Sequence, residues 1–118
     1  MTLYMVEIAA ADFDASVTWY RDVLQLVVEL IDERNRFALL RGESGGRLAI
    51  KQGVPVRDGV RLHFLVPDLV AALDRLHELR IAIEEPPKAS SEGYRRAVIL
   101  DPDGNPISLF EWTSPTDG

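Results

Sequence analysis

The chain has 118 residues, 47% of them hydrophobic and 27% charged, which is the composition of a single folded domain. No apolar run approaches the ~20 residues of a membrane span, and no basic-then-apolar leader precedes the first strand-like stretch, so we expect a cytoplasmic protein without a membrane partner. The absence of cysteine excludes disulfides and thiolate chemistry. A net charge of −6 argues against nucleic-acid binding and favours cationic ligands.

The first half of the chain is repeated in the second half, with 56 residues separating Asp12 from its counterpart Asp68. In each copy a short strand-like run (5–9 or 61–66) precedes the aspartate, and an apolar stripe with helical spacing follows it. The stripes are Phe13, Val17, Tyr20 and Val23 in one copy, and Leu69, Leu73, Leu76 and Leu79 in the other. We therefore expect two amphipathic helices, with Asp12 and Asp68 as their N-caps.

The downstream parts of the two copies also match, with 59 residues between Gly45 and Gly104. Each part is expected to form three strands, at 27–31, 36–41 and 47–51 in the first copy and at 81–84, 94–100 and 107–111 in the second. Residues 85–93, which are rich in Pro and Ser, are expected to form an exposed loop. The predicted fold is an α+β single domain, 1–118, of two tandem βαβββ modules (about 3–52 and 60–113) joined by a linker at about 53–59.

Two stretches resemble a known family. DFDASVTWYRDVLQL (12–26) and GYRRAVILDPDGNPISLFEW (93–112) are similar to the helix and the closing strand–turn–strand of the vicinal oxygen chelate superfamily, which includes glyoxalase I, extradiol dioxygenases and bleomycin-resistance proteins. The resemblance implies an open curved mixed sheet with helices outside, and a homodimer. Gln25 and Arg80 stand where members of this family usually have a glycine in a left-handed conformation at the end of the helix.

The resemblance also implies a cavity on the sheet face opposite the helices, where metal-dependent members carry His/Gln, Glu, His and Glu ligands. The matching positions here are Met5, Ala49, Arg61 and Ser108. A thioether, a methyl group, a guanidinium and one hydroxyl do not suit a divalent ion, so we expect no metal and no cofactor. A register error of two residues would instead bring Glu7 and His63 into ligand positions.

Strand alternation assigns several polar side chains to this inner face. It carries three basic residues, Lys51, Arg61 and His63, and Glu7 is expected to bond one of them because buried charges need partners. These groups form either a structural polar network or a ligand-binding set with Glu7 as base or anchor and Arg61 as anion clamp. The candidate ligand-binding residues are Met5, Glu7, Lys51, Arg61, His63, Ser108 and Phe110. Trp112 is expected on the opposite face.

Two functions from different classes fit this pattern. The first is a metal-independent, homodimeric small-molecule-binding protein that sequesters an antibiotic or aromatic metabolite in a groove at the dimer interface. The second is an enzyme of the superfamily, of lyase, isomerase or dioxygenase type, which depends on a metal or uses Glu7 and His63 as an acid–base pair. A third possibility is a non-catalytic partner protein acting through its surface.

Overall fold

The internal repeat corresponds to two structural units of the same topology. The computed structural model describes residues 1–56 and 60–113, and the chain divides into units at Met1–Val60 and Arg61–Gly118, called unit 1 and unit 2 below. The last three positions of the expected linker, 57–59, lie outside the described residues. Within the described ranges no helix is long and apolar enough to cross a membrane.

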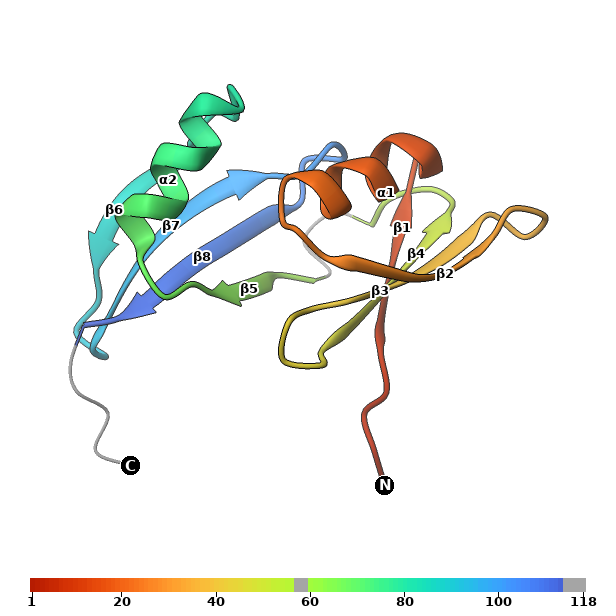
Figure 1. Ribbon diagram of the computed structural model, residues 1–118, viewed down its shortest axis with the longest axis horizontal. Coiled ribbons are helices and arrows are strands. Elements are labelled where there is room, and N and C mark those ends of the chain that lie inside the picture. The colour runs from red at the N-terminus through yellow and green to blue at the C-terminus, as the bar shows by residue number, and fades with distance from the viewer. Residues whose placement is uncertain (57–59, 114–118) are drawn as a thin grey trace. The chain divides into compact units, whose positions relative to one another are not determined.

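Unit 1 is a four-stranded mixed sheet with one helix across one face (Figure 1). Its elements are β1 (Val6–Ala10), α1 (Phe13–Asp22), β2 (Val27–Asp32), β3 (Phe37–Arg41) and β4 (Arg47–Gln52). The strand order is β1-β4-β3-β2, with β1 parallel to β4 and the other neighbours antiparallel. The core between helix and sheet is mainly apolar, with Phe13, Tyr20, Leu40 and Ile50 almost completely buried.

Unit 2 repeats this arrangement (Figure 1). Its elements are β5 (Leu62–Leu65), α2 (Leu69–Glu78), β6 (Glu85–Ala89), β7 (Tyr94–Leu100) and β8 (Pro106–Trp112), in the strand order β5-β8-β7-β6. Its core is formed by Leu69, Leu76, Ile99 and Ile107, all buried. The prediction of an α+β fold of tandem βαβββ modules is therefore confirmed.

Both helices begin as the sequence predicts, and each has a second anchor from the last strand of its unit. Asp12 accepts a hydrogen bond from the amide of Ala15, and Asp68 accepts one from Ala71, both at 3.1 Å. The first helical amide of α1, at Phe13, donates to Gln52 Oε1 at 3.0 Å. The equivalent amide of α2 donates to Glu111 Oε2 at the same distance. Each helix N-terminus is thereby fixed to the strand that carries the centre of the inner face.

The final hairpins of the two units share the same turn. Gly45 and Gly104 have φ of 94° and 83°, a left-handed conformation that glycine adopts without strain. In unit 2 the turn is reinforced by the Asp101 carboxylate, which accepts from the amides of Asp103 and Asn105 at 2.9 and 2.8 Å. The turn aligns β7 with β8 residue by residue along their whole length.

One strand lies outside its expected position. The expected strand at 81–84 is absent, and β6 occupies 85–89, inside the segment predicted to be a loop. This strand contains two consecutive prolines, Pro86 and Pro87, which cannot donate to a sheet ladder. They are tolerated because β6 is the outer edge of its sheet and the register with β7 shifts between Glu85 and Lys88.

Candidate functional site

The inner face of unit 2 is the face of its sheet away from α2, and its residues follow from the strand register. His63 on β5 pairs with Ser108 on β8, which pairs in turn with Val98 on β7. Two residues farther along the strands, Phe110 lies between Leu65 and Arg96. Paired residues of neighbouring strands project to the same side of a sheet, so these side chains share one surface.

A pocket of about 200 Å³ opens on this face and is lined by His63, Tyr94, Phe110 and Trp112. Its three aromatic rings meet edge to face, with ring centroids 6.0 Å apart for Tyr94–Phe110, 6.2 Å for Tyr94–Trp112 and 5.4 Å for Phe110–Trp112. This is the preferred geometry of aromatic pairs, so the rings support one another as a wall. The pocket is open to solvent, since the Trp112 side chain is 50% exposed.

The expectation that Trp112 lies on the face away from the cavity is therefore wrong. Phe110 and Trp112 are two residues apart on one strand and point to the same side. Tyr94, the cross-strand partner of Trp112, completes the wall.

Positive charge surrounds the pocket. Partial desolvation of the imidazole, together with the charges of Arg61 and Arg96, lowers the pKa of His63 below its ordinary value. The lowered pKa favours the neutral imidazole, which has one nitrogen able to accept a proton. Arg96 is the register partner of Phe110, so a guanidinium borders the aromatic wall directly.

Ser108 contributes a buried hydroxyl at the centre of the same face. The residue is completely buried, and its Oγ has no hydrogen-bond partner among the residues described. A buried polar group without a partner costs roughly 1–3 kcal/mol, and in native proteins such groups are few. Its neighbours are His63 on one side and Val98 on the other, so the hydroxyl lies beside the pocket.

Unit 1 has different residues at the positions equivalent to the wall of this pocket. The repeat places Lys51 where unit 2 has Phe110, and Gly53 where unit 2 has Trp112. Lys51 Nζ donates to the backbone carbonyl of Asn35 at 2.7 Å rather than to Glu7, whose side chain is exposed. Since Glu7 keeps contact with water, it has no need of the ionic partner that the sequence analysis expected.

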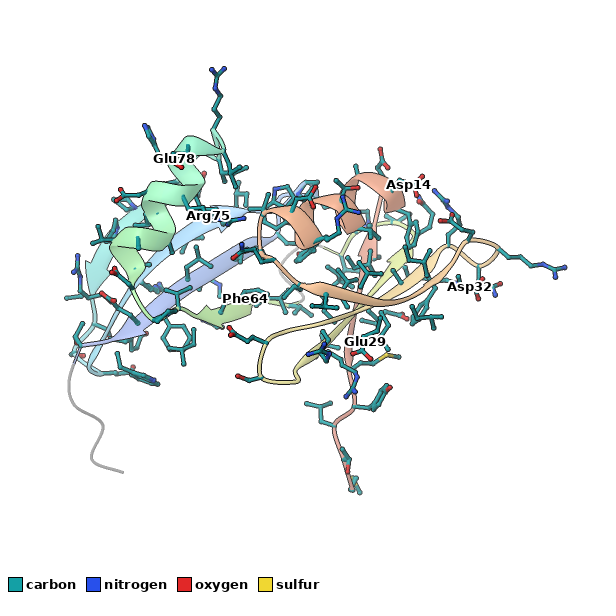
Figure 2. The ribbon with its side chains drawn as sticks, in the orientation of Figure 1. Asp14, Glu29, Asp32, Phe64, Arg75 and Glu78 are labelled. Atoms are coloured by element: carbon teal, nitrogen blue, oxygen red, sulfur yellow. The ribbon has the colours of Figure 1, made fainter. Side chains whose placement is uncertain are left out.

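The inner face of unit 1 instead holds an ion cluster. Glu29, on the side of the sheet away from α1 (Figure 2), lies 3.2 Å from Arg47 Nε and 3.5 Å from Arg41 Nε. The Arg47 guanidinium also stacks over the Tyr4 ring, 4.7 Å from its centroid. The cations of this cluster are thus already satisfied by the chain itself.

The structure brings together part of the candidate set predicted from the sequence. His63, Ser108 and Phe110 share one surface of unit 2, and the charge of Arg61 acts on His63. Met5, Glu7 and Lys51 belong to unit 1. Sequence reasoning missed Tyr94, Arg96 and Trp112. Two-residue alternation from Phe110 would have found Trp112.

The residues at the family's four metal positions do not fit a divalent cation. Ala49 is fully buried between Glu7 and Leu39, and its methyl group offers no lone pair. Ser108 offers one neutral hydroxyl, and Arg61 carries a positive charge. Among the residues that the structure describes, no three His, Asp or Glu side chains gather into a metal-binding group.

Comparison with solved structures identifies the fold. The chain is similar to an integron cassette protein from a Halifax Harbour sewage outfall metagenome, with 16% identity, coverage of 93% of this chain and 97% of that one, and a TM-score of 0.80. It is similar to a superfamily member from Sphaerobacter thermophilus, with 21% identity, coverage of 94% and 97%, and a TM-score of 0.78. It is also similar to a lactoylglutathione lyase from Agrobacterium tumefaciens, with 19% identity, coverage of 93% and 92%, and a TM-score of 0.76.

A search of curated proteins finds no match to this chain. The family model described as Glyoxalase/Bleomycin resistance protein/Dioxygenase superfamily, in contrast, matches residues 2–109. That match extends over both units and includes residues 12–26 in full and residues 93–109 of the hairpin segment on which the sequence resemblance rests. With its paired βαβββ units, this chain belongs to the Glyoxalase/Bleomycin resistance protein/Dioxygenase superfamily.

Proposed function

We propose that this protein binds a small aromatic molecule in the pocket of unit 2, without a resident metal, and acts by sequestering it. The observation that carries the proposal is the wall of three aromatic rings beside His63. A half-exposed indole leaves a large apolar surface in water, and a planar ligand lying against it would remove that surface from solvent. The unsuitable donor set at the family's metal positions supports binding without a metal.

The two tryptophans provide a direct test, because only one of them, Trp112, lines the pocket. Trp19 lies on α1, with its ring centroid 5.0 Å from that of Tyr20. In a ¹⁵N–¹H spectrum of the labelled chain, the two indole N–H signals are assigned with Trp19→Phe and Trp112→Phe. Titration with the neutral probe indole-3-acetamide should shift the Trp112 signal saturably and leave the Trp19 signal in place. Phe110→Ala should abolish the shift. Equal movement of both signals, or no saturable movement, would refute the proposal.

A homodimer is part of the same proposal. Apolar side chains stay exposed in both units, Leu30 and Ile31 on β2 and Leu65 on β5 among them, and association of two copies would cover such surface. Sedimentation equilibrium between 1 and 100 μM should give twice the mass of the chain. A single species with the mass of one chain across that range would exclude the dimer.

An enzymatic function has one observation in its favour, the lowered pKa of His63. A neutral imidazole in an open pocket can remove a proton from a bound molecule. Glu7, its expected partner, belongs to the other unit and is exposed. The two functions are separated by following a bound ligand over time. Binding alone returns the ligand unchanged after denaturation of the protein, whereas catalysis returns a product and is lost in His63→Gln.

A further inference from the structure

The charge around the pocket opposes the charge of the whole chain. The chain carries a net −6, yet the inner face of unit 2 presents two guanidinium groups, Arg61 and Arg96, with Lys88 paired across the sheet to Arg96. Among the described residues of β5 to β8, the acidic side chain on this face is Glu85, on the outer edge strand. It is three strands from His63, which corresponds to about 14 Å at ~4.8 Å per strand. Glu111 belongs to the opposite face, where it anchors α2.

Arg61 and Arg96 differ from the cations of unit 1 in their interactions with the rest of the chain. In unit 1, Arg41 and Arg47 share Glu29, and Lys51 is bonded to a carbonyl. In unit 2, neither Arg61 nor Arg96 forms an ion pair or hydrogen bond with any of the residues described. Positive groups that repel one another around an aromatic wall, with no carboxylate between them, provide a favourable potential for an anion.

Ser108 places a hydroxyl without a partner next to the pocket residue His63, but the hydroxyl itself does not line the pocket. It is fully buried and lies between His63 and Val98, at the centre of the inner face. At the equivalent position unit 1 has Ala49, which carries no polar group.

We propose that the pocket selects an aromatic molecule that bears an anionic group, with the ring against Tyr94, Phe110 and Trp112 and the anion directed to Arg96 and Arg61. The proposal rests on the proposed function, because it presupposes that the pocket binds aromatic rings. It differs from the expectation drawn from net charge, which favoured a cationic ligand. The charges next to the pocket, rather than the net charge of the chain, determine which ligand charge is preferred, because charges farther away are screened beyond about 8 Å at physiological salt.

Three probes with the same ring and different charge test this selectivity at pH 7.5: indole-3-acetate, indole-3-acetamide and tryptamine. The dissociation constant of each is measured from the Trp112 indole signal. We expect the acetate to bind roughly fivefold more tightly than the amide, and tryptamine to bind most weakly, since half-exposed charge pairs contribute modestly. Raising the salt concentration to 1 M should reduce the advantage of the acetate over the amide.

Arg96→Gln should bring the affinities of acetate and amide to within about twofold. Arg95→Gln is the matched control, because Arg95 is the next residue on β7, faces the other side of the sheet and lies 3.9 Å from Glu111. It should keep the full preference. Equal thermal midpoints of the two variants would show that both remain folded.

The outcomes separate the two proposals. If all three probes bind equally, or tryptamine binds best, the charge selectivity is refuted and aromatic binding stands. If none of the three binds saturably, aromatic binding fails and the selectivity fails with it. If Arg95→Gln loses the preference as fully as Arg96→Gln, the effect belongs to net charge rather than to the pocket.

Discussion

Single side chains in this fold show where local preferences are overridden. Gln25, Arg36 and Arg80 adopt φ of 59°, 51° and 60°, a left-handed conformation that is unfavourable for residues with a Cβ. The sequence predicted two of these positions, since Gln25 and Arg80 stand where a helix-ending glycine is usual. At Arg80 the conformation closes α2, because the amide of Ile81 donates to the Leu76 carbonyl at 2.9 Å.

Replacing Arg80 by glycine should therefore stabilise the protein by about 1 kcal/mol, because glycine adopts this conformation without steric strain. Arg36→Gly is the informative comparison. Arg36 is ion-paired with Asp14 at 2.8 Å and lies 4.8 Å from the Phe13 ring centroid, so its loss should cancel the conformational gain. Guanidinium denaturation measures both. A lower midpoint for Arg80→Gly would contradict the strained conformation.

Truncating Ser108 to alanine should stabilise the protein, whereas truncating an ordinary core residue destabilises it. Ser108→Ala removes an unpartnered buried hydroxyl and should raise the free energy of unfolding by about 1 kcal/mol. Val98→Ala, at the adjacent buried position of the same face, should lower it by about 1–3 kcal/mol through the cavity it leaves. If Ser108→Ala destabilises the protein as much as Val98→Ala does, the hydroxyl has a partner.

At the scale of elements, the agreement between sequence and structure follows from how local each signal is. The two helices could be predicted because capping and 3.6-residue periodicity act within a few residues of Asp12 and Asp68. The strand β6 could not, because residues 85–89 are exposed throughout and show no apolar alternation. Residues 85–89 form a strand because they pair with the edge of β7, and that edge is available only once the rest of the sheet has formed.

The anchoring of each helix to its last strand is testable with variants that the repeat itself suggests. Gln52 and Glu111 both accept from the first helical amide, so a neutral amide side chain suffices for this role. Glu111→Gln should change the free energy of unfolding by a few tenths of a kcal/mol, whereas Glu111→Ala should lower it by about 1–2 kcal/mol by leaving the Leu69 amide unpaired. Chemical denaturation followed by far-ultraviolet circular dichroism distinguishes them. Equal losses in both variants would show that the charge of Glu111, rather than the bond, stabilises α2.

At the scale of the whole molecule, the duplicated architecture carries two different inner faces. Where unit 2 has aromatic residues and cations without partners, unit 1 has Lys51 bonded to its own turn and Glu29 neutralising two arginines. Single-strand alternation predicted that His63, Ser108 and Phe110 share a face. Predicting that Tyr94 and Arg96 belong to the same face requires the register between β7 and β8. That register depends on how the two strands pair and cannot be obtained from either strand alone.

The donor sets of both units lead to the last prediction, on metal binding. Unit 1 offers Met5 and Ala49 at the family's ligand positions, and unit 2 offers Arg61 and Ser108, so no pairing of these positions yields two anionic or imidazole donors. Elemental analysis of the purified chain should find less than about 0.1 equivalent of zinc, nickel, manganese or iron. Adding any of these ions, or EDTA, should leave the thermal midpoint unchanged, because a ligand of the native state raises it only by binding. One tightly held ion per chain would contradict this prediction, and Glu7→Ala and His63→Gln, each made alone, would then show whether either side chain ligates it.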